Sequence, residues 1–314
     1  MTWASRQEVN GVGTLRWTDL AAAPELAAGV VAVERQIPAF LAELTADTRA
    51  QLTASEPAGT AVLVTTDAEV VAVVRSVRLT WDGQRSQAPA AGVREALRRA
   101  GEDRGRVGPA GGDTVAVLDL VVAEAWRGRG VGSAVLAELD GWRVHRGADR
   151  LLVLLRPHAK QAYPLVPFAR YAGFVTAAGE PFDPWFRAAW RAGLVPVRGV
   201  DRSFIARAAL DDWQRWLGRP VPGSGPYLVP GAIKPAILET ERDAGGYREP
   251  HLWSAPVTSL APLPDGREDG QGEGHPREPV VEAGPAASGG WIGALAAAGV
   301  VAGDRSHRQI RRRR

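Results

Sequence analysis

Residues 114–133 read TVAVLDLVVAEAWRGRGVGS and contain the pattern that decides the fold. Residues 114–122 are apolar and rich in β-branched side chains, apart from Asp119, which predicts a strand. The glycine-rich segment RGRGVG follows, and residues 133–146 have the composition of a helix. A second apolar run, LLVLL at residues 151–155, predicts a strand that is buried on both faces. The order of strand, glycine loop, helix and strand predicts a βαβ unit.

The glycine-rich segment is predicted to bind a phosphate group. A turn at this place exposes backbone N–H groups at the positive end of a helix dipole, and glycines let an anion come close to them. A P-loop is excluded because the segment has no lysine. A dinucleotide fingerprint is disfavoured because its third glycine would fall on Ser133. A plain tight turn and an RGG-like RNA contact are the remaining alternatives.

Residues 122–133 resemble the acyl-CoA pyrophosphate loop of the GNAT superfamily of N-acyltransferases, which has the form Arg/Gln-x-x-Gly-x-Gly/Ala. The defining positions are occupied by Arg127, Gly130 and Gly132. The preceding residues are in register with the family pattern Asp-Leu-x-Val-x-Pro-x-x-Arg, with Glu124 in place of proline. Further on, FARYAGF at residues 168–174 resembles the segment Phe-Tyr-x-x-x-Gly-Phe that closes the family's core.

The resemblance covers roughly residues 10–180 and implies an α/β fold with a mixed, mostly antiparallel central sheet flanked by helices. It also implies acyl transfer from acetyl-CoA or a similar thioester to the primary amine of a small molecule or amino acid. In such a reaction the amine attacks directly, which agrees with the absence of cysteine from the chain. Carried over to this sequence, the pyrophosphate is held by the amides of the loop, and the pantetheine arm is paired by backbone groups where the two central strands splay. The residues concerned are Arg127, Gly128, Arg129, Gly130, Val131, Gly132 and Ser133 for the loop, and Val121 and Val122 for the arm.

Asp119 is the predicted catalytic residue, either as the base or as the anchor of the substrate ammonium group. It interrupts an apolar strand, where a carboxylate is costly unless it meets a cation or a water-lined cleft. A structural aspartate that bonds the neighbouring backbone is the alternative.

The general acid is not identified by the pattern, because Ala169 stands where the family usually has tyrosine. Tyr171 lies two residues further on, which on a helix turns its side chain by about 200°. Either Tyr171 or Tyr163 could substitute as the acid, or the thiolate leaves without one, but packing roles are expected for both. His158 and Lys160 follow the second strand and could reach the thioester, but surface positions are expected for both.

The rest of the chain predicts a division into residues 1–180 as the GNAT domain, 181–254 as a small α+β extension, and 255–314 as a disordered linker with an arginine-rich tail. Within the first part we expect a hairpin over residues 60–81. The connection over residues 84–112 is expected to hold one short helix, near residues 93–100.

Charge is concentrated at the end of the chain. Residues 303–314 hold six arginines and one aspartate, so the body carries a net charge of −2 although the whole chain carries +3. A basic body that grips nucleic acid is therefore excluded. The five histidines show no metal-ligand spacing, so no metal is expected. The apolar run at residues 291–303 is too short to span a bilayer, and a cysteine-free chain without a signal peptide predicts a cytoplasmic protein.

Three functional hypotheses follow. The leading one is an acetyl-CoA-dependent N-acetyltransferase, for which the sequence also allows a homodimer. The second is a non-catalytic CoA-binding or protein-interaction module of the same fold, which the missing tyrosine favours. The third is an RNA- or ribosome-associated acetyltransferase that is recruited by the arginine tail at residues 305–314.

Overall fold

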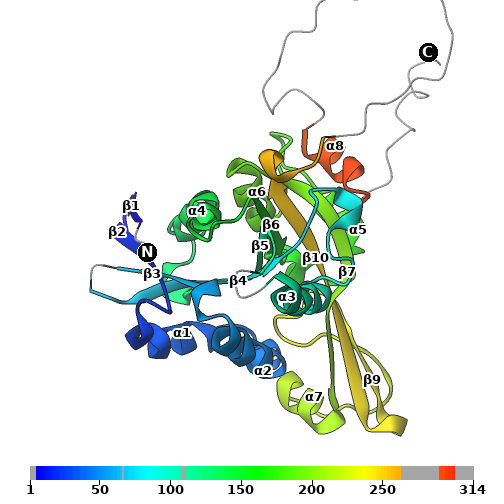
Figure 1. The fold of residues 1–314 in the computed structure, drawn as a ribbon. Helices are drawn as coiled ribbons and strands as arrows, with labels where there is room; N and C mark the ends of the chain where they lie inside the picture. The colour runs from blue at the N-terminus through cyan, green and yellow to red at the C-terminus, as the bar shows by residue number, and fades with distance from the viewer. Residues whose placement is uncertain (1–4, 66, 108–110, 263–289, 301–314) are drawn as a thin grey trace, which may run out of the picture.

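The computed structural model describes residues 5–65, 67–107, 111–262 and 290–300 of the chain (Figure 1). Its strands are β1 (Arg6–Val9), β2 (Gly13–Asp19), β3 (Thr60–Val64), β4 (Val70–Leu79), β5 (Thr114–Val122), β6 (Arg150–Leu155), β7 (Leu194–Ala209), β8 (Gly225–Tyr227), β9 (Ala236–Glu239) and β10 (Ala244–Pro256). Its α-helices are α1 (Ala27–Glu34), α2 (Ala39–Ser55), α3 (Val93–Val107), α4 (Val131–His145), α5 (Phe168–Ala172), α6 (Pro184–Arg191), α7 (Leu210–Leu217) and α8 (Gly290–Ala297).

The described strands form one ten-stranded mixed sheet. Its order is β1-β2-β3-β4-β5-β6-β10-β9-β8, and β7 pairs with β10 outside this path. Among the described pairs, β5 and β6 are parallel and every other pair is antiparallel. The predicted fold class is thereby confirmed, as is the βαβ unit made by β5, α4 and β6.

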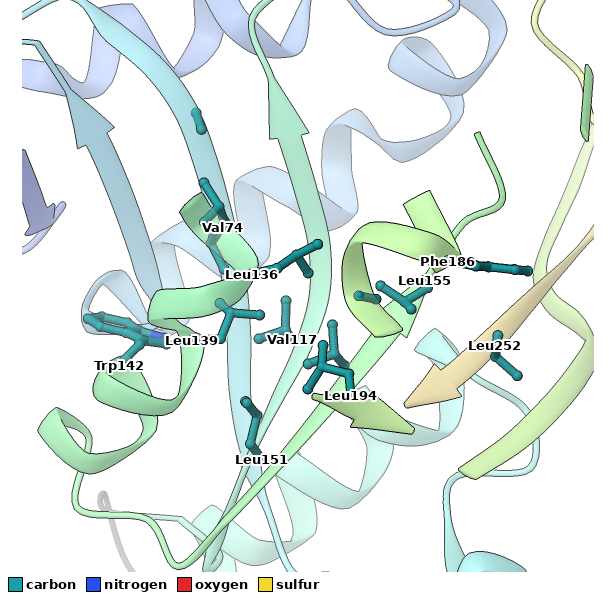
Figure 2. Close-up of a cluster of buried hydrophobic side chains, with 14 of the residues drawn as sticks. Val74, Val117, Leu136, Leu139, Trp142, Leu151, Leu155, Phe186, Leu194 and Leu252 are labelled. Carbon is teal, nitrogen blue, oxygen red and sulfur yellow. The ribbon is translucent and has the colours of Figure 1, made fainter. Parts of the chain in front are cut away.

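Helices cover both faces of the sheet, and the alternation along the central strands explains why. Val115 and Val117 of β5 pack on the side of α4, α6 and α8, whereas Ala116 and Leu118 pack on the side of α3. On β6, every residue from Leu151 to Leu155 is buried, so the prediction of a strand covered on both faces is confirmed. Figure 2 shows the larger cluster, in which side chains of the central strands meet those of α4 and α6.

The predicted hairpin is confirmed as β3 and β4, but helix α3 is almost twice as long as expected. Two glycines and two arginines in its second half, beyond residue 100, weaken the helical pattern of the sequence. In the structure, Asp103 on this part accepts a hydrogen bond from the backbone N–H of Thr80, at 2.5 Å, and Ala100 packs in the core. Tertiary contacts therefore extend the helix beyond the length that propensity predicts.

The sheet does not end at the predicted boundary at residue 180. Strand β10 lies between β6 and β7, so residues 194–256 complete the same sheet. The distal halves of β7 and β10 continue beyond β6 as an arm with α7, β8 and β9, which packs a small core against Phe40 and Leu41 of α2 (Figure 1).

Helix α8 lies within the segment for which disorder is predicted. Its Trp291 is buried, packs against Phe186 and Trp190, and donates a hydrogen bond from Nε1 to the carbonyl of Ala172 at 2.8 Å. An apolar helix with a docked tryptophan is ordered by the surface it covers. The predicted linker over residues 263–289 and the arginine tail lie outside the described residues. No helix among the residues that the structure describes is long and apolar enough to cross a bilayer.

Candidate active site

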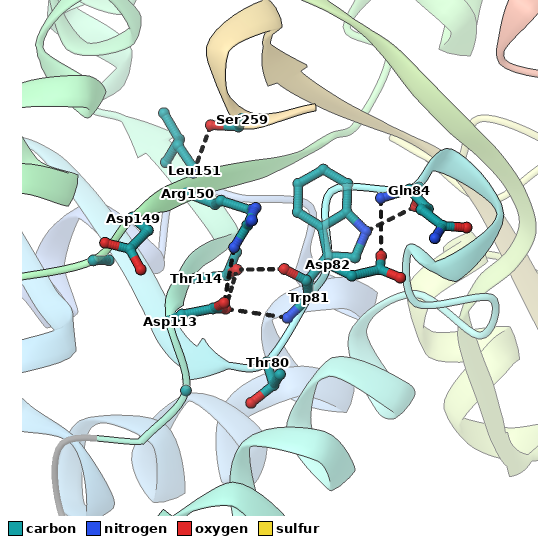
Figure 3. Close-up of polar contacts among 12 residues, drawn as sticks. Thr80, Trp81, Asp82, Gln84, Asp113, Thr114, Asp149, Arg150, Leu151 and Ser259 are labelled. Carbon is teal, nitrogen blue, oxygen red and sulfur yellow. Dashed lines mark hydrogen bonds and ion pairs between the residues drawn. The ribbon is translucent and has the colours of Figure 1, made fainter. Parts of the chain in front are cut away.

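The parallel strands β5 and β6 are held together near their amino-terminal ends by side-chain hydrogen bonds (Figure 3). Asp113 accepts hydrogen bonds from Arg150 Nη1 at 2.8 Å and from the backbone N–H of Trp81 at 3.2 Å. Close by, Ser259 Oγ accepts one from the backbone N–H of Leu151 at 3.0 Å. These contacts fix the register in which β5 and β6 start.

The same strands separate at their carboxyl-terminal ends. They pair from Thr114 opposite Arg150 as far as Val117 opposite Val153, and there the pairing stops. On the other side of β5, Ser76 lies opposite Val117 but Arg75 lies opposite Asp119, so Leu118 is the extra residue of a β-bulge. The bulge bends β5 away from β6, which continues along β10 instead. Among the described strands, none pairs with β5 on this side beyond Val117; we call this opening the notch.

The direction of the backbone groups along the notch follows from the ladder with β4. The N–H of Ala123 donates to the carbonyl of Val71 at 2.9 Å, and Val122 lies opposite Ala72. Because antiparallel pairs alternate between bonded and non-bonded positions, Val121 directs its N–H and C=O groups to β4. Leu120 and Val122 direct theirs into the notch. Of the two residues predicted to pair with a pantetheine arm, Val121 therefore faces β4 and Val122 faces the notch.

The glycine loop leads from the notch to the start of α4. Gly130 precedes the helix with φ of +86°, and Gly128 has φ of +73°, a backbone region that side chains rarely adopt. The first described bond of this turn runs from Ala134 N–H to Gly130 C=O, so the amides of residues 131–133 have no carbonyl one turn back. Residues 127–130 are exposed. The loop thus presents free amides at the positive end of a 15-residue helix, which fits a pyrophosphate.

Gly132 is required for a different reason. A Cβ at this position would lie 2.7 Å from Cζ3 of Trp185, a distance that side chains do not tolerate. The glycine allows α6 to pack closely against the first turn of α4.

Two arginine side chains of the loop contact groups beside it. Arg127 Nε donates to the carbonyl of Val122 at 2.9 Å, and the Arg129 guanidinium lies 5.5 Å from the ring centre of Trp126. Trp126 Nε1 in turn donates to Glu69 at 2.9 Å. The two arginines thereby add positive charge beside the amides.

Asp119 lies at the edge of the notch within a cluster of two acids and two guanidinium groups. Arg49 Nε of α2 donates to its Oδ2 at 2.9 Å, and Arg75 Nη1 lies 3.8 Å from the same oxygen. Arg75 also pairs with Glu34 of α1 and is almost fully buried. Burial raises the pKa of the Asp119 carboxyl, but the combined effect of Arg49, Arg75 and His251 is larger and opposite. The pKa of Asp119 is therefore below its ordinary value. We call these four residues the Asp119 cluster.

A second polar cluster lies on the other side of the notch, around the buried carboxylate of Glu249 on β10. Arg156 donates to both of its oxygens, at 2.6 and 3.2 Å. Tyr247 donates its hydroxyl at 2.6 Å, and His251 Nε2 lies 3.1 Å from Oε1. Burial raises the pKa of Glu249, but Arg156 and His251 outweigh it and lower that pKa to about 2. We call these four residues the Glu249 cluster.

Part of the chain matches a known protein family. Residues 32–174 match the model of the Acetyltransferase (GNAT) family. These residues belong to that family. The chain is similar to arginine N-acetyltransferase avaD of Aspergillus versicolor, with 26% identity over an alignment of length 157 that covers 44% of this chain and 54% of that protein. The chain therefore matches about half the length of this curated relative.

Among solved structures, the loading GNATL domain of CurA from Lyngbya majuscula is similar with a TM-score of 0.45 and 13% identity, covering 78% of this chain and 96% of that one. The GphF GNAT-like decarboxylase in complex with isobutyryl-CoA has a TM-score of 0.45 and 16% identity, covering 75% and 96%. The GNAT domain of S. lividans PAT has a TM-score of 0.37 and 18% identity, covering 62% and 90%.

Within the GNAT domain, the described tyrosines near the usual acid position have other partners. Tyr171 is buried and donates its hydroxyl to Asp183 at 2.7 Å, while burial and this aspartate raise its pKa. Tyr163 packs on the rings of Tyr171 and Phe182. Both therefore contribute to packing, as predicted.

The two basic residues after β6 have different environments. His158 is exposed, as predicted, but the surface position predicted for Lys160 is wrong. Lys160 is buried and donates to the carbonyls of Tyr163 at 2.9 Å and Ile233 at 3.1 Å. Burial lowers its pKa to about 8. The segment after β8 that covers it could not be placed from local pattern.

Sequence reasoning also missed the Glu249 cluster, although a signal was present. Tyr247, Glu249 and His251 are polar or polar-tipped at every second position, which places all three on one face of a strand. No group of three or more histidines, aspartates and glutamates within the described residues is arranged to hold a metal ion.

Proposed function

We propose that this chain transfers an acetyl group from acetyl-CoA to the primary amine of a small molecule or amino acid by direct attack. The observation that carries the proposal is the continuity of the α4 amides with the notch. An anion at the first turn of α4 and an extended arm along Leu120 and Val122 lead a thioester to the place where β5 and β6 separate.

The residues around the loop divide the work of binding. The amides of Gly128, Arg129, Gly130, Val131, Gly132 and Ser133 hold the pyrophosphate, and the side chains of Arg127 and Arg129 screen its charge. The amide predicted to contribute at Arg127 instead donates to the carbonyl of Glu124 at 3.2 Å. Val122 and Leu120 pair with the amides of the pantetheine arm.

Asp119 contributes charge at the edge of the notch. Its carboxylate is shared between Arg49 and Arg75, and its pKa is lowered, so it is a weak proton acceptor at neutral pH. We propose that it attracts and orients the substrate ammonium group, which is the second of the two roles predicted for it.

Arginine is the first acceptor to assay, because the name of the curated relative gives that substrate for that protein. The assay is favourable here, since the chain has no cysteine and the CoA thiol released by turnover is the only thiol present. A panel of other amino acids and simple primary amines extends the search.

The proposal is tested by calorimetric titration of acetyl-CoA into the wild type and into Gly130→Glu. The substitution puts bulk and negative charge where the pyrophosphate binds, so binding is expected to be lost. Arg129→Glu adds negative charge without straining a left-handed backbone position, and it is expected to weaken binding at least tenfold, or about 1.4 kcal/mol. Gly147→Glu is the matched control, because it carries the same strain at φ of +61° beyond the other end of α4 and has open space around it.

Each outcome separates the hypotheses. Failure of the folded wild type to bind acetyl-CoA overturns the proposal. Binding without turnover on any amine supports the non-catalytic CoA-binding module instead. Cytoplasmic location, a homodimer and recruitment to RNA by the arginine tail stay predictions.

A further inference from the structure

The Asp119 and Glu249 clusters lie on the same face of the sheet. Along β10, Leu252 packs on the side of α4 and α6, whereas Trp253 packs on the side of α3. His251 alternates with Leu252 and therefore lies on the α3 side. Asp119 contacts Arg49 of α2, which covers that same face.

The two clusters also lie on opposite sides of the notch. Asp119 follows Val117, the last residue of β5 that pairs with β6. On the other side, Leu155 of β6 pairs with Leu252, so His251 is level with the end of β6. The charge of His251 is close enough to contribute to the lowered pKa of Asp119, after the larger effects of burial and of the two arginines. Asp119 and His251 are therefore near each other across the notch.

His251 has one ring nitrogen engaged and one without a partner. Nε2 faces Glu249 Oε1 at 3.1 Å, and an ionised carboxylate only accepts, so Nε2 carries the hydrogen. Nδ1 is then the acceptor nitrogen, and it has no hydrogen-bond partner among the described residues. The side chain is only 10% exposed. A buried acceptor without a donor is costly, and this cost indicates that a ligand supplies the donor.

Glu249 is equipped to keep His251 in this tautomer. Arg156 and Tyr247 occupy its remaining acceptor positions and hold it ionised, as the low pKa of about 2 reflects. A carboxylate that orients an imidazole in this way fixes the nitrogen that faces the substrate.

We propose that His251 is the catalytic base of this acyltransferase, with Nδ1 taking a proton from the acceptor ammonium group, and that Glu249 is its positioning residue. The assignment rests on the proposed function. It names a residue 77 positions beyond the matched family segment, on a strand that closes the sheet beside β6.

The proton and electron pairs balance as follows. The ammonium group of the acceptor gives one proton to Nδ1 and becomes a neutral amine. The amine nitrogen then attacks the thioester carbonyl carbon, and the carbon–sulfur bond breaks. The departing thiolate takes the second proton from the nitrogen and leaves as the CoA thiol. The imidazolium releases its proton to solvent, so one proton is produced for each amide formed.

A pH profile distinguishes His251 from the groups that face it. Arg156, which follows β6, has a raised pKa beside Glu249, Glu249 and Asp119 have lowered pKa values, and burial raises that of Tyr247. In the Asp119 cluster, burial also raises the pKa of Glu34, and β7 places Val200 opposite His251. These shifts keep Glu249, Asp119, Arg156 and Tyr247 from titrating between about pH 5 and pH 9, and the variant Glu34→Gln measures what Glu34 contributes in this window. A fall in kcat/KM on the acid side of this window is therefore the signature of His251.

The test compares His251→Gln with His158→Gln, an exposed histidine after β6, on an amine that the wild type acetylates. At pH 7, His251→Gln is expected to lower kcat/KM by about 10²–10³-fold while acetyl-CoA binding is retained. The difference in kcat/KM between His251→Gln and the wild type is expected to shrink as the pH approaches the pKa of the amine substrate, because the free amine then needs no base. His158→Gln is expected to behave like the wild type.

Two further variants keep the test decisive. In His251→Gly, added imidazole is expected to restore part of the activity, which a purely structural role does not predict. Glu249→Gln is expected to shift the acid limb of the pH profile of kcat/KM. An unchanged profile in this variant would contradict the positioning role of Glu249.

Activity of His251→Gln within twofold of the wild type at pH 7 overturns the assignment, as does a deficit that is the same at every pH and not rescued by imidazole. These results leave the proposed function intact. No turnover by the wild type on any amine overturns the proposed function and this assignment together.

Discussion

The two polar clusters beside the notch use the same kinds of side chain to different ends. In the Asp119 cluster, one carboxylate is shared by Arg49 and Arg75 and keeps a quarter of its side chain exposed. In the Glu249 cluster, the carboxylate is buried and is surrounded by Arg156, Tyr247 and His251. In the first arrangement, two guanidinium groups share one carboxylate at the edge of the notch. In the second, a carboxylate orients a histidine whose Nδ1 has no partner among the described residues.

A carboxylate within an apolar strand therefore does not by itself identify a catalytic base. Asp119 satisfies the sequence criterion, yet its two arginines make it a poor proton acceptor. Glu249 is more deeply buried, and its proposed role is to orient His251. Four predictions test this contrast, and they are ordered by the size of the expected effect.

Removing the buried carboxylate should have the largest effect. In Glu249→Ala, Arg156 and Tyr247 lose their acceptor, and the free energy of unfolding should fall by about 3–5 kcal/mol. Urea denaturation at pH 7 measures this change. Glu180→Ala, which removes a partly exposed ion pair with Arg191, is the control and should change the free energy of unfolding far less. A loss at Glu249 as small as that of the control would show that the cluster is not stabilising.

The acid stability of the chain should depend on the same residue. Because the folded pKa of Glu249 is about 2 against an ordinary 4.5, its contribution is complete above pH 4.5 and is lost as the pH falls towards 2. Unfolding measured from pH 5 to pH 2 should show about 3 kcal/mol of pH-dependent loss in the wild type that is missing from Glu249→Gln. Parallel curves for the two proteins would contradict the low pKa.

Neutralising Asp119 should have a smaller effect on turnover than replacing His251. Asp119→Asn keeps the shape of the side chain and removes one charge that attracts the ammonium group. We expect kcat/KM for the amine to fall about tenfold, or about 1.4 kcal/mol, mainly through KM, with the acid limb of the pH profile preserved. Loss of that limb in Asp119→Asn would return the role of base to Asp119.

Loosening the fastened ends of β5 and β6 should have the smallest effect. Arg150→Met removes a partly exposed ion pair with Asp113, and the free energy of unfolding should fall by about 0.5–1 kcal/mol. Turnover and acetyl-CoA binding should be unchanged, because the notch lies at the other end of these strands. A change in kcat greater than threefold would show that the register at the fastened ends controls the opening.

Local pattern predicted the elements of the centre of the fold well. The β-branched runs, the glycine loop and the following helix are short-range features, and β5, α4 and β6 match their predicted ranges to within two residues. Pattern failed for α8 and for the second half of α3, where an amphipathic or apolar helix is stabilised by the surface that it covers.

The candidate site divides in the same way. The glycines and arginines of the loop are adjacent in the chain, so their spacing alone predicts an anion site. The Glu249 cluster joins residues 156 and 249, which are brought together only because β10 pairs with β6.

By itself, the sequence determined the glycine turn, the strands on either side of it and the resemblance to the GNAT family, since each is encoded within a few residues by backbone freedom and periodicity. Only the tertiary structure decided that Val121 faces β4, that Asp119 is shared by two arginines and that His251 flanks the notch. These facts depend on ladder register, on a bulge at Leu118 and on the insertion of β10. All three are contacts between distant segments, whose free energy is gained only when the whole sheet assembles.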